Sequence, residues 1–262
     1  MSETTVRLGG MALGNGVLVH GPTAWACAIR TESGEIKVAS RRKGLQASNV
    51  ANPLFRGPAK LAEAFALLPQ VKRALPEAQL PFQRPRVLAA MVGSVVAGSL
   101  LRRSKLRTAT QEAIGALLSV APAVLALRGG ELAAYHGAEH MTIGGYEHGE
   151  ARPKEHERCG SHLLGPMLVT TAVANVATRH APERSLKAAR AAGALGAVAV
   201  STELFGWMTR HPGHTLARAL AWPGHELQHR FATAEPDEGQ LEVADAALRA
   251  CLELEHAAAA SS

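Results

Sequence analysis

The residues best suited to chemistry lie between positions 131 and 162, where five of the twelve histidines of the chain fall. His136 and His140 are four residues apart, so on a helix their imidazoles lie on the same face, as a pair of metal ligands requires. Glu139 stands between them in the order His-x-x-Glu-His, which is the order of the inverted zincin metalloproteases. In such a site the imidazoles bind Zn²⁺ and the carboxylate acts as a general base.

Three further side chains in this stretch could complete the site. Glu147 offers oxygen, His156 nitrogen and Cys159 sulfur, each a known donor to zinc. We therefore predict Glu139 as the catalytic residue and a divalent metal, zinc by its donor types, as the cofactor. Two other interpretations stay open: a polar helix end whose side chains bond one another or solvent, and a proton relay or ligand site without metal.

A second polar cluster repeats the spacing near the C-terminal end. His225 and His229 stand four apart beside Glu226, after Pro223-Gly224, which is a typical helix start. For this pair we favour an exposed helix N-terminus over a metal site. No Ser-His-Asp order, phosphate-binding glycine loop or dinucleotide fingerprint stands out elsewhere.

The elements that position these residues are mostly helical. Glycine-punctuated apolar runs over residues 6–40 predict β structure, with a hairpin turn at Ser33-Gly34. Apolar residues at helical spacing predict a helix at 60–68, and another at 236–256 with acidic residues in its first turn. The β-rich region is thus expected at 1–52, a helical core at 53–235 and a C-terminal amphipathic helix with its tail at 236–262.

Four apolar stretches nearly free of charge lie within the core. They are residues 87–101, 108–127, 159–178 and 191–209. A membrane-crossing helix needs roughly 20 apolar residues, so the last three reach that length and 87–101 falls short. Because basic residues flank 87–101 at both ends, the positive-inside rule gives it no orientation. These patterns alone leave a soluble helical bundle and a membrane protein equally open.

Charge and hydropathy indicate which kind of partner the protein has. The chain has 262 residues, 47% of them apolar, and a net charge of +6 from 28 basic and 22 acidic residues. Its mean hydropathy of +0.02 lies between the values for soluble and membrane proteins. The basic clusters flank apolar runs and lack interleaved aromatic residues, so we expect membrane lipid and no nucleic acid as partner.

The cysteines and the N-terminal residues argue against a disulfide-rich protein, a four-cysteine zinc module and a cleavable signal peptide. Three cysteines, Cys27, Cys159 and Cys251, without a paired C-x-x-C spacing exclude a full disulfide framework and a zinc module held by four cysteines. Residues 1–7 hold no apolar segment, so we expect no cleavable signal peptide.

Four blocks of sequence together resemble a known family. The blocks are Gly9-Gly10-Met11-Ala12-Leu13-Gly14-Asn15-Gly16-Val17 with Gly21-Pro22; Pro53-Leu54-Phe55-Arg56-Gly57; His136-Gly137-Ala138-Glu139-His140 with Tyr146-Glu147 and His156-x-Arg158-Cys159-Gly160; and the segment from Thr233 to Ala244. They are similar to blocks of the YqhQ-like bacterial family, a domain of unknown function described as predicted metal-dependent, multi-pass membrane proteins. The resemblance runs nearly from end to end of the chain.

The chain departs from the family pattern at several positions in or next to these blocks. Met11 and Asn15 stand where the family has Gln and Glu, His20 replaces an Arg, and Met141 replaces a Lys. If the missing N-terminal Glu belongs to the family's site, activity is altered or lost here. The core of His136, Glu139 and His140 is intact.

With this resemblance the sequence predicts a mainly α (α+β) protein. It is a membrane-embedded bundle of about four apolar helices, with a short N-terminal β region, cytoplasmic termini and several crossings of the cell membrane. The leading hypothesis for function is a metal-dependent, hydrolase-like enzyme whose substrate is unknown. The alternatives are a non-catalytic membrane scaffold or small-ligand-binding protein and a soluble interaction module, and a homo-oligomer stays open.

Overall fold

The computed structural model describes residues 5–127, 130–178 and 181–260. This part of the chain is mainly helical, with eight α-helices and an N-terminal four-stranded antiparallel sheet, which confirms the predicted fold class. Two compact units divide the chain. Unit 1 consists of Met1–Gln46, Ala66–His156 and His229–Ser262, and unit 2 of Ala47–Phe65 and Glu157–Gln228.

The sheet of unit 1 is a meander of strands in chain order. The strands are β1 (Gly9–Leu13), β2 (Gly16–His20), β3 (Ala24–Arg30) and β4 (Ile36–Arg42). The predicted hairpin is confirmed, because β3 and β4 pair from Arg30 and Ile36 onward. Gly34 takes a positive φ of 87° in that turn, a conformation that glycine adopts without steric cost.

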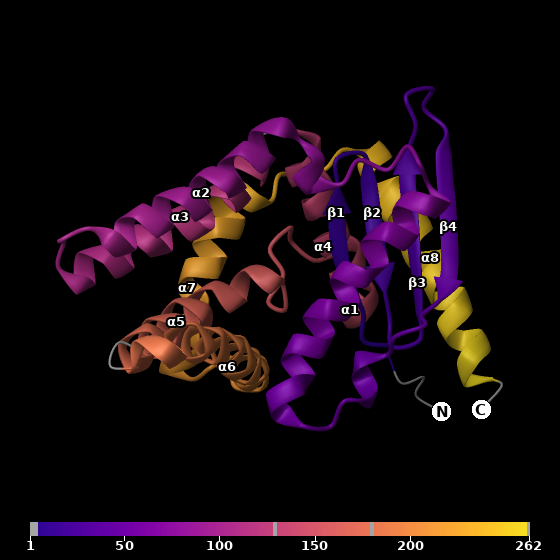
Figure 1. The fold of residues 1–262 in the computed structure, drawn as a ribbon. Helices are drawn as coiled ribbons and strands as arrows, with labels where there is room; N and C mark the ends of the chain where they lie inside the picture. The colour runs from indigo at the N-terminus through magenta and orange to yellow at the C-terminus, as the bar shows by residue number, and fades with distance from the viewer. Residues whose placement is uncertain (1–4, 128–129, 179–180, 261–262) are drawn as a thin grey trace. The chain divides into compact units, whose positions relative to one another are not determined.

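Both faces of the sheet are covered, because β3 alternates small and large apolar side chains. Ala26 and Ala28 lie in a core with α4 (Glu131–His148) and α8 (Glu238–Ala259). Trp25 and Cys27 point to the other face and pack on the C-terminal half of α1 (Pro53–Ala74). Figure 1 shows α4 and α8 behind the sheet and α1 in front of it. The helix predicted at 236–256 begins at Glu238 because Asp237 is its N-cap.

The first two apolar stretches of the sequence form a helical hairpin in unit 1. Its helices are α2 (Pro85–Arg103) and α3 (Thr108–Leu127), which pack on each other. The prediction that 87–101 is too short to cross a membrane was wrong. The helix begins two residues earlier and ends two residues later, since Pro85 suits a first turn and two arginines can occupy the last.

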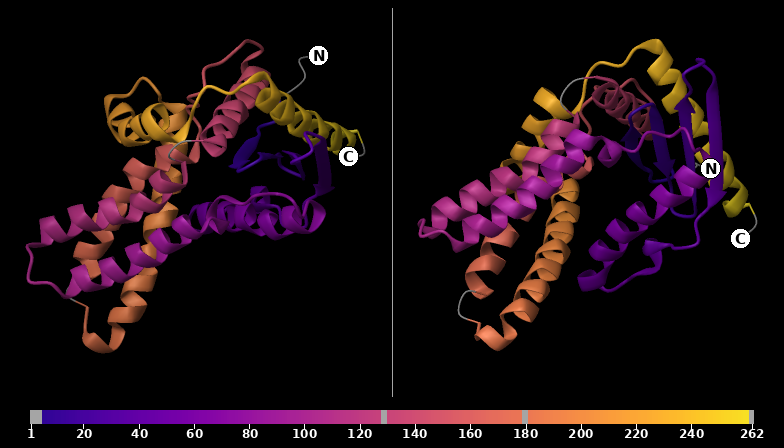
Figure 2. Two further views of the ribbon diagram at one scale, coloured as in Figure 1. Left: turned by 90° about the horizontal axis from the view of Figure 1, so that it is seen from above. Right: turned by 45° about the horizontal axis from the view of Figure 1, so that its top comes forward.

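Unit 2 holds the other two apolar stretches as an antiparallel pair. Its main helices are α5 (Leu164–Thr178), α6 (Glu183–Arg210) and α7 (Thr215–Leu227), with α5 and α6 side by side (Figure 2). The hydroxyls of Thr170 and Ser201 lie 2.7 Å apart between α5 and α6. The segment Arg56-Gly57 docks on α6, where Arg56 pairs with Glu203 and a Cβ on Gly57 would collide with a side chain.

Among the described helices, α2 and α6 are long and apolar enough to cross a membrane. Residues 110–126 of α3 and the whole of α4 would give a third crossing if together they form one span, bent by 90°. The predicted stretch 159–178 is a helix only from Leu164 onward, 15 residues long, because a 3₁₀ turn occupies Gly160–Leu163. Helix α4 packs against β1 and α8 and belongs to unit 1.

Candidate metal centre

Helix α4 carries the centre of the predicted site and is buried along most of its length. Small residues let other segments of unit 1 approach it closely. A Cβ on Gly137 would collide with the carbonyl oxygen of Ala234, and one on Gly144 would lie 3.1 Å from the Cβ of Arg152. The helix ends at Gly149, which has a positive φ of 70°. The glycines of the motif therefore place two loops against the face that bears the histidines.

Two backbone carbonyls fix the orientation of both motif histidines. The Nδ1 atom of His136 lies 2.8 Å from the carbonyl oxygen of Ala232, and that of His140 lies 2.6 Å from the carbonyl oxygen of Lys154. Because a carbonyl oxygen can only accept a hydrogen bond, each Nδ1 carries the proton. In the neutral rings the lone pair is then on Nε2. The ring centroids are 4.3 Å apart.

Glu139 lies between the two Nε2 atoms. Its Oε2 atom is 3.8 Å from Nε2 of His136 and 3.7 Å from Nε2 of His140. The residue is only 7% exposed, because its carboxylate packs on Gly10 of β1, where a Cβ would overlap it. Burial raises the pKa of Glu139. Positive charge on His136 and His156 lowers this pKa, and the negative charge of Glu147 raises it further, with burial the largest effect. A carboxylate with a raised pKa is a stronger base than an exposed one.

Glu147 and His156 lie beside this triad in unit 1. Oε2 of Glu147 is 3.5 Å from Nε2 of His156, and their side chains are 7% and 14% exposed. The ring of His156 is 5.5 Å from that of His140, measured between centroids. The structure thus brings together five of the six predicted site residues within unit 1, from one helix and the loop that follows it.

Cys159 follows His156 by three residues and is half-buried. The boundary between the two units falls within this loop, so Cys159 is counted with unit 2. His136, His140 and Cys159 form a group that could hold a metal ion.

The donor set fits a divalent metal of the zinc type. Two imidazole nitrogens, a thiol and nearby carboxylates are the ligands that zinc takes in proteins. Oε2 of Glu139 is 3.8 and 3.7 Å from the two Nε2 atoms, so the carboxylate stands beside the position that a metal bound by both histidines would take. Metal-binding histidines nearly always donate their other N–H to an oxygen, as His136 and His140 do.

The second histidine pair has a different environment. Helix α7 begins at Thr215, so the predicted start at Pro223 was wrong and this proline lies inside the helix. His225 is exposed in the last turn of α7, and His229 lies in the π-helical segment Gln228–Ala232. The side chain of His229 is 63% exposed and its Nδ1 contacts Glu155.

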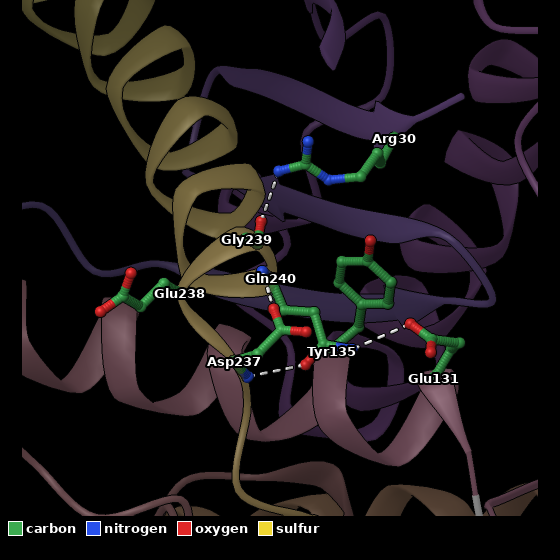
Figure 3. Close-up of a pocket in the computed structure, with 7 residues that line it drawn as sticks. All are labelled: Arg30, Glu131, Tyr135, Asp237, Glu238, Gly239 and Gln240. Atoms are coloured by element: carbon green, nitrogen blue, oxygen red, sulfur yellow. Dashed lines mark hydrogen bonds between the residues drawn. The ribbon is translucent and has the colours of Figure 1, made fainter. Parts of the chain in front are cut away.

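A polar cavity of about 410 Å³ lies in unit 1 where α8 begins (Figure 3). It is lined by Arg30, Glu131, Tyr135, Asp237, Glu238, Gly239 and Gln240. Asp237 and Gln240 form a capping box, and the amide of Gln240 donates to Glu131 on α4. Arg30 donates to the carbonyl oxygen of Gly239. These bonds fasten α8 to α4 and β3, which explains the motif at 233–244 as a structural block.

Comparisons with known proteins bear on this part of the chain. Residues 130–254 match the DUF1385 family, described as a protein of unknown function. The matched stretch begins next to α4, ends within α8 and contains all six predicted site residues. No curated protein and no solved structure matches the chain. The blocks at 9–22 and 53–57 lie outside the match, so there the YqhQ-like resemblance stays a prediction.

Sequence reasoning missed the groups that hold the histidines and the glutamate. The acceptors at Ala232 and Lys154 are backbone carbonyls, which no residue type announces. A usable signal existed for Gly10, because paired glycines in a strand often mark close approach of another group.

Proposed function

We propose that the protein is a metal-dependent, hydrolase-like enzyme of the cell membrane. In this proposal His136 and His140 bind a divalent metal, zinc by its donor set, and Glu139 is the base. Glu147, His156 and Cys159 are the candidates for the remaining positions around the metal.

One observation carries the proposal. The Nδ1 atoms of both motif histidines donate to backbone carbonyls, and their Nε2 atoms both lie within 4 Å of one buried carboxylate oxygen. A polar helix end would leave such side chains bonded to each other or to water. Here the folded backbone fixes both rings, which is the preorganisation that a metal site requires.

The residues then have separate tasks. A bound metal would supply Lewis-acid chemistry at the site. Oε2 of Glu139 accepts a proton, and its raised pKa makes the carboxylate a better acceptor. Glu147 lies against Nε2 of His156 and orients that ring if His156 binds metal through Nδ1.

The membrane part of the proposal rests on the apolar helices. Helices α2 and α6 have the length and composition to cross a bilayer. We propose a multi-pass protein with lipid as its partner and both termini in the cytoplasm. A hairpin of crossing helices returns the chain to the side from which it entered, and the paired helices α2 and α3 fit this arrangement.

The test combines metal analysis with a base-deficient variant. Purified protein is expected to hold about one equivalent of metal. The variant Glu139→Gln should keep the metal but fail to restore the phenotype of cells that lack the gene. If Glu139→Gln keeps the metal and restores the phenotype, the enzymatic role is contradicted and the non-catalytic alternative is favoured. Wild-type protein without metal, after growth and purification in the presence of zinc, would contradict the site itself.

A further inference from the structure

The cavity at the start of α8 shares no residue with the histidine centre (Figure 3). Its volume of about 410 Å³ lies within the roughly 300–1,000 Å³ of small-molecule sites. Glu131, Asp237 and Glu238 in its wall are exposed, so the cavity opens to solvent. The hydrogen bonds that fasten α8 to α4 and β3 use only some of the polar groups of this wall.

Tyr135 contributes a buried donor to the cavity. The residue is only 3% exposed, and its hydroxyl points toward the side that Arg30 forms (Figure 3). A guanidinium can only donate, so Arg30 cannot accept the phenolic proton, and no other described residue does. Burial raises the pKa of Tyr135, and so does the negative charge of Glu131, which keeps the proton in place. A buried donor without an acceptor is costly, so this hydroxyl calls for an acceptor on a ligand.

Arg30 adds further donors on the same side. Its Nη1 donates to the carbonyl oxygen of Gly34, and its Nη2 to the carbonyl oxygen of Gly239 and to Glu242. These bonds occupy three of the five N–H groups of a guanidinium. One side of the cavity therefore offers donors and a positive charge, which suit a carboxylate.

The rest of the wall offers acceptors and negative charge. One oxygen of Asp237 caps α8, and one oxygen of Glu131 accepts from Gln240. The second oxygens of these two carboxylates, and both oxygens of Glu238, have no hydrogen-bond donor among the residues that the structure describes. These groups suit an ammonium, which brings three donors and a positive charge.

The two sides together select the ligand. A metal cation has no acceptor for the hydroxyl of Tyr135, and a simple amine has none either. A simple carboxylate is repelled, because three carboxylates face one guanidinium in the wall. A zwitterion satisfies both sides at once.

We infer that this cavity binds a free α-amino acid. Its carboxylate accepts from Tyr135 and Arg30, and its ammonium donates to Glu131, Asp237 and Glu238. The inference goes beyond the proposed function and uses no residue of the metal centre.

Calorimetric titration of the dialysed, metal-loaded protein with each standard α-amino acid tests the inference. At least one is expected to bind with a Kd below about 1 mM. The amine and the carboxylic acid that match this amino acid, each lacking one of its two charged groups, should bind at least about ten-fold more weakly. An absence of binding by every amino acid, or a matched amine that binds equally well, would overturn the inference.

Variants place the binding in this cavity. Tyr135→Phe and Glu131→Gln should each weaken binding about ten-fold, because each removes one hydrogen bond to a charged group of the ligand. Glu253→Gln, at an exposed residue of α8 outside the cavity, is the control and should bind as wild type does. Glu238→Gln replaces Glu131→Gln if that variant does not accumulate. Undiminished binding in Tyr135→Phe and in the carboxylate variant would overturn the inference. Metal content, measured on the same samples, should stay at the wild-type value, so loss of the amino acid does not count against the metal centre.

Discussion

Two histidine pairs in this molecule share the same spacing and a neighbouring glutamate, and they differ in their surroundings. His136 and His140 are four apart beside a glutamate, and so are His225 and His229. The first pair lies on one buried helix, and backbone carbonyls fix both rings. The second pair is exposed, and its members fall in an α-helix and the π-helical segment that follows.

The comparison teaches that spacing selects candidates and that tertiary contacts distinguish a site from a surface. Both glutamates and all four histidines satisfy the composition of a metal site. In the first pair backbone carbonyls hold both Nδ1 atoms and both Nε2 atoms lie beside one buried carboxylate. The histidines of the second pair are exposed, so a metal would have to order their side chains at a cost in conformational entropy.

Removing the first histidine pair should abolish metal binding, whereas removing the second should leave it unchanged. His136→Ala with His140→Ala should reduce bound zinc from about one equivalent to near zero, because both fixed nitrogen donors are lost. The matched double variant, His225→Ala with His229→Ala, should keep its metal. Elemental analysis of the purified proteins measures both, and equal metal loss from the two variants would remove the distinction between the pairs.

Glu147, the carboxylate beside His156, should strengthen zinc binding without being essential for it. Glu147→Gln is expected to weaken zinc binding about 10–100-fold, the usual cost of losing an orienting partner or a single weak ligand. Glu150→Gln, at an exposed residue of the adjoining loop, is the control and should bind zinc as wild type does. Competition with a chromophoric chelator gives both constants. An unchanged constant for Glu147→Gln would exclude this residue from the site.

Close packing of the sheet on the base should be visible at Gly10. Gly10→Ala places a Cβ where the carboxylate of Glu139 lies, so it should lower the free energy of unfolding by about 1–3 kcal/mol. Gly44→Ala has open space around its Cβ and should change stability little. Denaturant titration measures both variants, and equal stability would mean that β1 does not confine the base.

The smallest expected effect is a pH dependence of the metal-free protein. Burial raises the pKa of Glu139, so the folded state binds this proton more tightly than the unfolded state does. Stability that is present at low pH should therefore fall as the pH rises from the ordinary carboxyl range through the raised pKa. Glu139→Gln cannot ionise and should show a shallower fall. Thermal unfolding of both metal-free proteins measures this, and parallel profiles would contradict it.

Local patterns predicted much of the fold and part of the site. Alternation and the Ser33-Gly34 turn predicted the β3–β4 hairpin, and i, i+4 spacing predicted the shared face of His136 and His140. Contacts between distant segments could not be predicted in this way. The carbonyl that holds His136 is 96 residues away, and its position follows from the docking of α8 on α4.

Helix limits were the other weak point of the sequence interpretation. Helix α2 extends over its flanking arginines, whereas α7 runs through Pro223 instead of starting there. Both differences arise because packing and end effects override the local preference of single residues. The extension of α2 brought an apolar stretch that was predicted too short up to membrane-crossing length.

X-ray absorption at the zinc edge of the loaded protein tests the central claim most directly, because it reports which atoms surround the metal. The account predicts at least two imidazole nitrogens at about 2.0–2.1 Å. It further predicts that this imidazole scattering disappears in His136→Ala with His140→Ala and persists in His225→Ala with His229→Ala. A zinc ion surrounded by oxygen alone, or imidazole scattering that survives the loss of His136 and His140, would contradict it.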